Sequence, residues 1–468
     1  MHPSGTHQRL LAGSTGDAGP PRSSDHAIVI GGSMAGMTIA QALRTRFDAV
    51  TVLDRDHLPD EAVPRPGVPQ DRHVHLLLAS GTTSFEQLFP GLFEELVTAG
   101  AAVGDPSRIR LCLNGHRLAR GPVGDPAVFA SRPFIEHHVR RRIRAEAGIE
   151  VVDGCTVRGL ATSDDGRRIV GVRTTSTSAE ATAGGGEDER ILPADLVVDA
   201  SGRRSSSPAW LEELGYAPPP VDELPVDLHY LTRRYHIPDE VVGGDRNLLI
   251  GPTRDLPLGG ALSKIEDDRW IATLFAMGGQ RPPRDPDRFE AFAGELATSD
   301  IHDALVAGEP LDEPTRYRFP ANQRRRYDRG HLPEGFLAAG DAVCSFNPIY
   351  GQGMSVAAHQ ALALRTLLTT GATPAPAAWF AAIQPMMDVA WELTCSSDLA
   401  VRAIAGRRDL MTRFRNGYLA RLHGAAARDP ALTARFMRVA GLAAPPSTLL
   451  RPTAVVRVLT HRLRSVPA

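Results

Sequence analysis

Lysine is nearly absent from this sequence, cysteine is scarce, and long hydrophobic runs are missing. The 468 residues contain a single lysine, Lys264, and four cysteines, Cys112, Cys155, Cys344 and Cys395. The cysteines form neither a C-x-x-C pair nor another metal-ligand spacing, so we expect reduced thiols in a cytoplasmic protein and no metal site. No stretch of ~18 uncharged apolar residues occurs, which excludes a membrane-spanning helix by its length.

Neither sign of charge dominates the chain. The sequence has 52 Lys+Arg and 54 Asp+Glu, a formal net charge of −2, which argues against a protein that coats nucleic acid and favours small-molecule partners. The length predicts two closely joined domains that can bury a cofactor together with an organic substrate. Residues 1–25 are rich in Gly, Ser and Pro and lack the apolar stretch of a signal peptide, so they predict a disordered tail.

The first ordered residues carry the pattern of a dinucleotide-binding unit. A strand at 26–30, a glycine-rich turn, a helix at about 34–46 and a second strand at 49–53 follow one another. Gly31 permits the sharp turn, and Gly36 permits close packing of the helix on the strand. The helix amides then point at a bound pyrophosphate.

Two more residues belong to this unit. Ser33 stands where the G-x-G-x-x-G pattern usually has its middle glycine, which weakens the match, although its hydroxyl can lie near phosphate. Asp54 follows the second strand, 23 positions after Gly31, close to the ~20 expected for an acid that binds a ribose hydroxyl.

The rest of the chain alternates between two kinds of pattern. Stretches with period-two alternation predict an antiparallel sheet, and the pattern past Asp341 is helical almost to the end. We therefore predict an α/β (α+β) fold in which a Rossmann-like nucleotide domain is interleaved with an antiparallel-sheet substrate domain. The expected strands and helices outside the first unit are 85–98 and 136–146 as helices and 108–118, 149–157, 169–174, 192–200, 226–237, 246–251, 259–266 and 268–276 as strands, with a loop at 175–189. The expected division is a tail at 1–25, nucleotide-domain parts at 26–105, 128–222 and 330–385, substrate-domain parts at 106–127 and 223–329, and a helical C-terminal region at 386–468.

In each of two later segments, a predicted buried strand ends at a glycine and an acidic residue. The segment 336–342 ends at Gly340-Asp341, and the Pro/Gly loop 347–353 then leads into a helix. The segment 194–203 closes on Asp199 and Gly202 in the same way.

Together these motifs resemble the single-component, group A FAD-dependent monooxygenases across roughly residues 26–390. The sequences of segments 63–77, 131–133 and 340–344 are similar to those of an actinobacterial branch of this family. This branch includes the epoxidases of polyether polyketide biosynthesis, such as the lasalocid and monensin epoxidases. The resemblance implies bound FAD, NADPH or NADH as electron donor, and O2 as co-substrate. The residues expected to bind the cofactor are Gly31, Ser33, Met34, Ala35, Gly36, Asp54, Arg55, Arg65, Arg132, Val157, Asp199, Gly202, Asp341, Pro348, Gly351, Gly353 and Met354.

The resemblance also implies individual roles. Arg65 would lie on the loop beside the isoalloxazine, Arg132 would reach the phosphate or ribityl region, and Val157 would meet adenine through its backbone. Asp341 would bind the ribityl hydroxyls, and Asp199 would serve FAD and the nicotinamide donor, or else only close a strand-end turn.

The implied reaction is oxygen transfer from a C4a-hydroperoxyflavin to an alkene, so no catalytic side chain is expected. His73 and His75 are candidate acid/base groups, although histidines in loops are more often structural. The expected substrate is a bulky apolar polyene or polyketide of antibiotic biosynthesis, either free or linked to a carrier. Side chains of the second sheet expected to contact it, unless they are ordinary sheet core, are Leu228, Tyr230, Leu249, Leu262 and Phe275.

Other functions stay open. An aromatic hydroxylase of the same flavin family would use a polar group to deprotonate a phenol, and an FAD-dependent double-bond reductase shares the fold. A flavin-binding sensor without turnover is a remote alternative. A halogenase is disfavoured. A resemblance to flavin halogenases would require a lysine beside the flavin and a W-x-W-x-I-P stretch, but Lys264 lies in a predicted strand and the sequence has no such stretch. The Arg-, Leu- and Val-containing segment 449–463 either packs on the body or touches a membrane surface or an apolar substrate.

Overall fold

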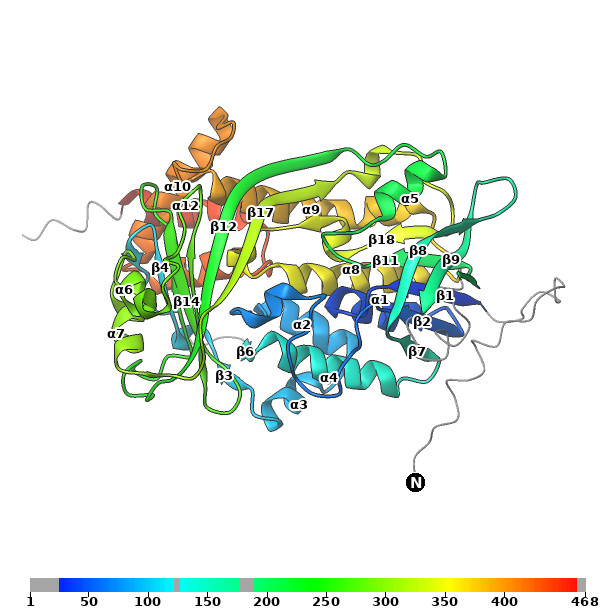
Figure 1. The fold of residues 1–468 in the computed structure, drawn as a ribbon. Coiled ribbons are helices and arrows are strands. Elements are labelled where there is room, and N and C mark those ends of the chain that lie inside the picture. Colours follow the sequence, from blue (N-terminus) through cyan, green and yellow to red (C-terminus); the bar gives the residue numbers. More distant parts are fainter. Residues whose placement is uncertain (1–24, 122–126, 177–188, 461–468) are drawn as a thin grey trace, which may run out of the picture.

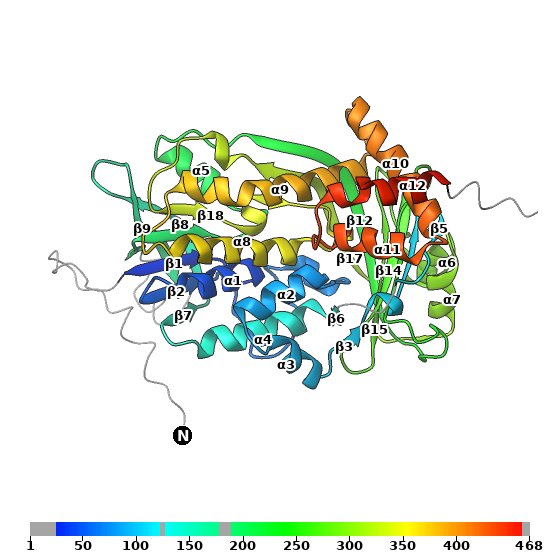
Figure 2. The same cartoon turned by 180° about the vertical axis from the view of Figure 1, so that it is seen from behind.

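The computed structural model describes residues 25–121, 127–176 and 189–460. The predicted tail at 1–25, except residue 25, and most of the predicted loop at 175–189 lie outside the described residues. Figures 1 and 2 show an elongated molecule with a nucleotide-type sheet at one end and a larger, strongly twisted sheet at the other.

The first sheet is parallel and has the strand order β18-β11-β1-β2-β7. Its strands are short and almost wholly buried, as expected for strands covered on both faces. Their bounds are β1 (His26–Ile30), β2 (Ala49–Leu53), β7 (Ile149–Val152), β11 (Leu196–Asp199) and β18 (Phe336–Ala338).

Two layers cover this sheet. Helices α1 and α4 pack against one face, α8 packs on α1, and the antiparallel sheet β10-β9-β8 covers the other face. Helix α9 extends over the end of β18, where the indole nitrogen of Trp379 donates to the carbonyl of Ala338 at 2.8 Å. The elements of these layers are α1 (Met34–Leu43), α4 (Arg132–Ala145), α8 (Gly353–Leu368), α9 (Pro376–Asp398), β8 (Cys155–Thr162), β9 (Ile169–Ser176) and β10 (Arg190–Pro193).

The second sheet has nine strands in the order β19-β17-β12-β15-β14-β13-β4-β5, with β16 paired to β12. It is antiparallel except where β13 pairs with β4. Helices α6 and α7 cover its outer face, and its inner face is turned toward the nucleotide domain. The bounds are β4 (Ile109–Leu113), β5 (His116–Arg117), β12 (Val221–His236), β13 (Asn247–Ile250), β14 (Leu258–Lys264), β15 (Trp270–Ala276), β16 (Glu309–Pro310), β17 (Thr315–Arg325), β19 (Cys344–Ser345), α6 (Phe289–Ala293) and α7 (Asp300–Val306).

The C-terminal helices pack together against the β4 side of the second sheet, around Leu422, Leu432 and Val458. None of the helices within the described ranges is long and apolar enough to cross a bilayer. All four cysteines are free thiols, and three of them are buried. The remaining elements are α2 (Ala79–Leu88), α3 (Leu92–Thr98), β3 (Ala102–Gly104), β6 (Ala127–Phe129), α5 (Ser207–Glu213), α10 (Leu410–Ala426), α11 (Pro430–Ala440) and α12 (Pro452–Thr460).

The α/β class, the parallel sheet, the separate antiparallel sheet and the helical C-terminus are confirmed, but several predicted elements are divided in the structure. The helical region 85–98 is two helices, α2 and α3, that meet at Gly91, whose φ is 78°. The strand 108–118 is the hairpin β4–β5, turned at Asn114 and Gly115, which both have positive φ. Each of the predicted strands 149–157 and 192–200 is two strands that belong to different sheets.

Candidate functional site

The turn between β1 and α1 has the geometry that its glycines predict. Gly31 has a φ of 107°, a conformation that favours glycine, and its amide donates to the carbonyl of Leu53 at 2.7 Å. A Cβ added to Gly36 would lie 1.7 Å from the carbonyl oxygen of Gly31. Helix α1 therefore approaches the turn as closely as glycine allows.

The carboxyl ends of three strands meet at this turn. The amide of Ala200, after β11, donates to the carbonyl of Ile30 at the end of β1, at 2.8 Å. Gly340, after β18, has a φ of 61°, and a Cβ there would lie 2.6 Å from the Cβ of Ala35. Segments some 300 positions apart in sequence thus touch at one edge of the sheet, the usual ligand position in an open α/β sheet.

A cavity of about 590 Å³ opens at this edge. The volume falls within the range of small-molecule and cofactor sites. The predicted cofactor residues that line it are Gly31, Ser33, Met34, Ala35, Asp54, Arg55, Arg65, Arg132, Val157, Gly202, Asp341, Pro348, Gly351, Gly353 and Met354. The other two predicted cofactor residues, Gly36 and Asp199, do not line it.

Asp54 is buried at the cavity wall, directly after β2. Its carboxylate accepts the amide of Gly32 at 2.7 Å and the amide of Asp56 at 2.9 Å. Burial raises the pKa of Asp54, and the nearby Arg65 guanidinium opposes the rise. The carbonyl of Asp54 accepts the amide of Cys155 at 2.9 Å, which brings β8 and Val157 to the cavity.

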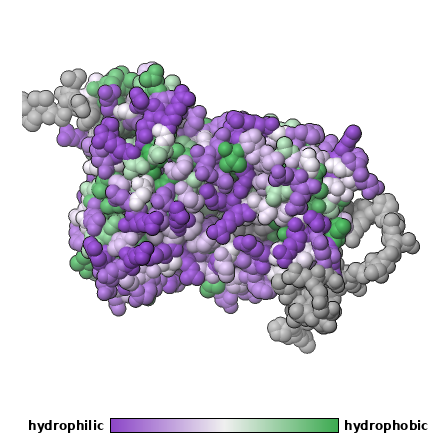
Figure 3. All heavy atoms as spheres, turned by 45° about the horizontal axis from the view of Figure 1, so that its top comes forward, coloured by the Kyte–Doolittle hydropathy of each residue, from purple (hydrophilic) through white to green (hydrophobic). Residues whose placement is uncertain are grey.

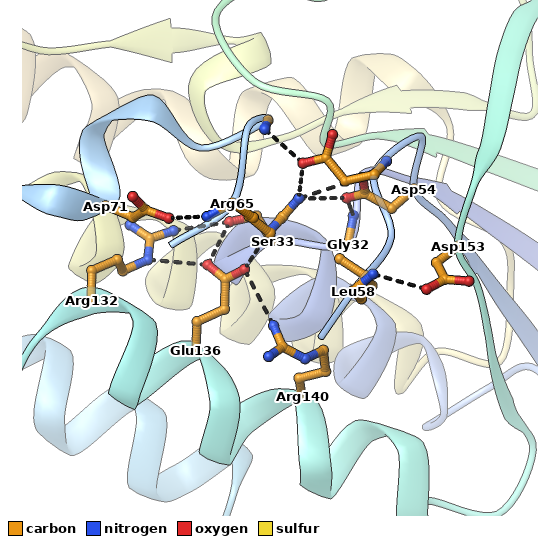
Figure 4. Close-up of polar contacts among 12 residues, drawn as sticks. Gly32, Ser33, Asp54, Leu58, Arg65, Asp71, Arg132, Glu136, Arg140 and Asp153 are labelled. Atoms are coloured by element: carbon orange, nitrogen blue, oxygen red, sulfur yellow. Dashed lines mark hydrogen bonds and ion pairs between the residues drawn. The ribbon is translucent and has the colours of Figure 1, made fainter. Parts of the chain in front are cut away.

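A buried ionic network centred on Glu136 supports the predicted arginines (Figure 4). Glu136 accepts Arg65 Nε at 3.0 Å, Arg132 Nε at 3.2 Å and the hydroxyl of Ser33 at 2.9 Å. Arg140 lies 3.8 Å away on the next turn of α4. Burial alone would raise the pKa of Glu136, but the guanidinium groups of Arg132 and Arg65 outweigh it and the pKa is lowered. The carboxylate therefore stays ionised and fixes both arginines at the cavity wall.

Sequence reasoning missed Glu136. It lies one turn into the Arg-rich helix, four residues after Arg132, and only 4% of its surface is exposed. The i,i+4 spacing was visible, but an acid on a charged helix is usually solvated. The burial comes from the loop around Arg65, which lies on α4 only in the folded chain.

The loop after β18 rests on a second buried acid, Asp398. Its carboxylate accepts the amide groups of Asn322 at 2.6 Å and Asn347 at 2.8 Å, and the hydroxyl of Tyr350 at 2.8 Å. Burial raises its pKa to about 6. The network joins β17, the cavity loop and the end of α9, so the loop that carries Gly351 is held from behind. The sequence did not predict this hydrogen-bond network either, because its members are far apart in sequence.

Asp199 does not reach the cavity. It is fully buried, and its carboxylate accepts the hydroxyls of Ser201 at 2.5 Å and Ser207 at 2.7 Å, together with that of Ser205. It therefore organises the turn after β11, which is the strand-end role that the sequence left open beside a contact with the cofactor.

The two candidate histidines lie in different surroundings. His73 is buried between the domains, where its Nδ1 lies 2.7 Å from the hydroxyl of Thr232 and its ring packs against Tyr230. His75 lines the cavity, with Nδ1 3.0 Å from the carbonyl of His73. Burial lowers the pKa of His73 to about 3 and that of His75 to about 4, so both are neutral near pH 7.

Of the five predicted substrate residues, Tyr230 lines the cavity. Leu228 and Phe275 belong to the same apolar cluster as Tyr230 but do not line the cavity. Leu262 is on the opposite face of the sheet, where it and its partner Ala272 belong to a second apolar cluster under α6 and α7. Leu249 is half-buried on β13 and does not line the cavity. The cavity is also lined by three apolar residues that were not predicted as substrate residues, Val74, Leu76 and Phe346.

Known proteins are similar to this chain in sequence or in fold. No protein-family model matches the chain. Protein Rv3254 of Mycobacterium tuberculosis is 37% identical over 367 residues, which cover 76% of this chain and 74% of that protein. The flavin-dependent brominase Bmp2 has a TM-score of 0.66 at 14% identity, covering 94% of this chain and 99% of the other. The p-nitrophenol 4-monooxygenase PnpA of Pseudomonas putida DLL-E4 has a TM-score of 0.60 at 15% identity, covering 88% and 96%.

The solved structures establish the fold of FAD-dependent monooxygenases and halogenases for this chain. The sequence similarity establishes kinship: the chain belongs to the family of the mycobacterial protein Rv3254.

Proposed function

We propose that the protein is an FAD-dependent monooxygenase that epoxidises alkenes of a bulky apolar polyene or polyketide, with NADPH or NADH as electron donor and O2 as co-substrate. The observation that carries the proposal is the contact between the turn after β1 and the turn after β18 at the edge of one cavity. Both turns carry the motifs that resemble FAD-binding segments.

The residues present fit FAD. Gly31 and Gly36 bring the backbone of the first turn as near to a ligand as a chain can come, and the start of α1 supplies free amides for a pyrophosphate. Asp54 offers a carboxylate for ribose hydroxyls, and Asp341 offers one for the sugar chain. Arg65 and Arg132 supply positive charge at the cavity wall.

When bound, FAD would accept electrons from the nicotinamide and activate O2, of which one atom would be transferred to the substrate and the other would leave as water. The chain's own residues bind and orient the cofactor and the substrate, and they exclude water from the cavity. The start of α8, which follows the loop bearing Gly351, would provide amides and a positive helix end for the flavin. Val74, Leu76 and Phe346 give the cavity apolar walls, which favour an apolar substrate and keep water out.

The experiment is to purify the protein with FAD and supply NADPH, O2 and a linear triene. We expect nicotinamide oxidation that depends on the triene and products that gain one oxygen atom for each epoxide, drawn from isotope-labelled O2. Asp341→Asn should lose this activity, whereas Asp164→Asn, an exposed acid, should keep it. Products that gain hydrogen without oxygen would instead identify a double-bond reductase, and a flavoprotein without turnover would identify a sensor.

One observation favours aromatic hydroxylation as a second candidate. His75 lines the cavity, and because its Nδ1 lies 3.0 Å from the carbonyl of His73, its Nε2 is the ring nitrogen placed to accept a hydrogen bond from a phenol. A phenol that is hydroxylated faster than the triene, with activity lost in His75→Gln, would support this reading. Halogenation is disfavoured, because Lys264 is paired with Asp239 and Asp268 and does not line the cavity.

A further inference from the structure

The charge of the chain is divided unevenly. Residues 399–468 contain 13 arginines, two aspartates and no glutamate, a formal charge of +11, whereas residues 1–398 carry −13. Figures 1 and 2 show that helices α10, α11 and α12 of this region lie together at the end of the molecule away from the parallel sheet. A nearly neutral protein therefore has one strongly cationic end.

The same end exposes apolar side chains. The start of α10 projects beyond the body of the molecule (Figure 1), and Leu410, Met411 and Phe414 there are 83%, 55% and 61% exposed. Figure 3 shows hydrophobic surface beside hydrophilic surface at this corner. Arg413, which lies between Met411 and Phe414 in sequence, is exposed and has no ion pair among the described residues. Leaving three large apolar groups in water is unfavourable, so their exposure points to a covering surface.

Three more arginines converge on one pocket of about 460 Å³ between α11 and the segment that follows it. Arg435, Arg438 and Arg451 line this pocket, with alanine and proline side chains between them. Arg435 donates to the hydroxyl of Thr453 at 3.2 Å, and within the described residues Arg438 and Arg451 have no side-chain partner. Guanidinium groups without carboxylates in a pocket are suited to a phosphate.

We propose that the C-terminal surface, made by α10, α11 and α12, binds an anionic phospholipid bilayer. Leu410, Met411 and Phe414 enter the boundary between headgroups and acyl chains, and the arginine pocket binds lipid phosphate. Exposed apolar residues flanked by arginine are the pattern of an interfacial helix, and each cation adds attraction to anionic lipid. A second copy of the chain that pairs through the same surface is disfavoured as the occupant, since two cationic surfaces repel each other. Nucleic acid would leave the apolar side chains uncovered.

The test is sedimentation of the full chain with vesicles of phosphatidylcholine alone or mixed with phosphatidylglycerol. We expect binding to the mixed vesicles, weaker binding to the neutral ones, and release at high salt. Replacing Arg435, Arg438 and Arg451 by Gln should weaken binding to mixed vesicles roughly 100-fold, at about fivefold for each arginine. Replacing Leu410, Met411 and Phe414 by Ser should weaken binding to both vesicle types.

Matched controls distinguish an effect of the C-terminal surface from a general effect of losing positive charge or apolar side chains. The triple variant R281Q/R284Q/R329Q removes three exposed arginines elsewhere, and I191S/V306S removes two exposed apolar groups. Both should bind vesicles like the unchanged chain, and all variants should keep its thermal unfolding temperature. Equal binding to both vesicle types, no vesicle binding, or a dimer that the arginine variant abolishes would each overturn the proposal. Capture of an acidic protein in place of vesicles would overturn it as well.

Discussion

The two ends of the cavity are built in different ways. At the nucleotide end, buried charges hold each other, with Glu136 between Arg65 and Arg132. At the sheet end, Tyr230 and Phe275 belong to a closed apolar cluster whose members come from several strands. Charged networks fix side-chain positions through a few strong, directional contacts, whereas apolar packing distributes the same task over many weak ones. We therefore expect single substitutions to have larger effects at the nucleotide end.

The largest expected effect is at Gly36. In Gly36→Ala the new Cβ would lie 1.7 Å from the carbonyl of Gly31, so α1 must move away from β1. We expect loss of FAD binding and a fall of about 4 kcal/mol in the free energy of unfolding. Urea unfolding and FAD titration measure both. Gly417→Ala, in open space on α10, should instead raise stability by about 0.5–1 kcal/mol, and equal behaviour of the two variants would contradict the account.

Glu136→Gln tests the ionic network next. The variant leaves Arg65 and Arg132 buried with less compensating charge, and we expect a loss of about 3 kcal/mol in stability together with weaker FAD binding. Glu95→Gln is the matched change, because Glu95 pairs with Arg141 and Arg142 nearer the surface. It should cost about 1 kcal/mol or less. The same urea titrations decide, and a larger effect at Glu95 would remove the distinction between the two networks.

Asp71 should make stability depend on pH at the nucleotide end. Burial raises its pKa from 3.8 to about 6, while its carboxylate accepts the amide of Arg65 at 2.8 Å. Because the folded pKa is the higher one, its stabilising effect is complete below about pH 4 and is lost as the pH rises through about 6. Asp71→Asn should therefore match the unchanged protein near pH 4 and exceed it by up to about 3 kcal/mol near pH 8. Urea unfolding at both pH values checks this, and an unchanged difference between them would refute it.

The smallest expected effect lies at the sheet end. Tyr230 lines the cavity, and Tyr230→Phe removes only its hydroxyl. We expect stability to stay within about 0.5 kcal/mol and FAD affinity to be unchanged, since the ring keeps its packing against His73 and Phe275. The KM for the organic substrate is the quantity that should change. A marked fall in FAD affinity would show that the two ends are not separate.

The sequence predicted the nucleotide end well because its motifs are local. Gly31, Gly36 and Asp54 lie within one strand-turn-helix-strand unit, where spacing alone places them. The sheet end depends on long-range register, and β17 was not predicted at all. Its alternation is interrupted by Pro320, which normally argues against a strand. In the structure Pro320 lies opposite the bulge in β12 between Pro225 and Leu228, where the ladder is already irregular.

The substrate residues show the same limit. Alternation along β14 places Leu262 on one face of the sheet, but only pairing with β15 decides which face meets the cavity. Glu136 and Asp398 could not be recognised for a related reason. Their importance arises from burial by segments that are distant in sequence.

The central claim is that the turn after β1 and the turn after β18 hold one flavin between them. Titration of the purified chain with FAD, followed by absorbance, tests this directly when Gly36→Ala and Asp341→Asn are measured beside the unchanged protein. We predict one FAD per chain and affinity that falls about tenfold or more in each variant. A protein that stays colourless with FAD, or an Asp341→Asn variant that binds FAD as tightly as before, would contradict the account.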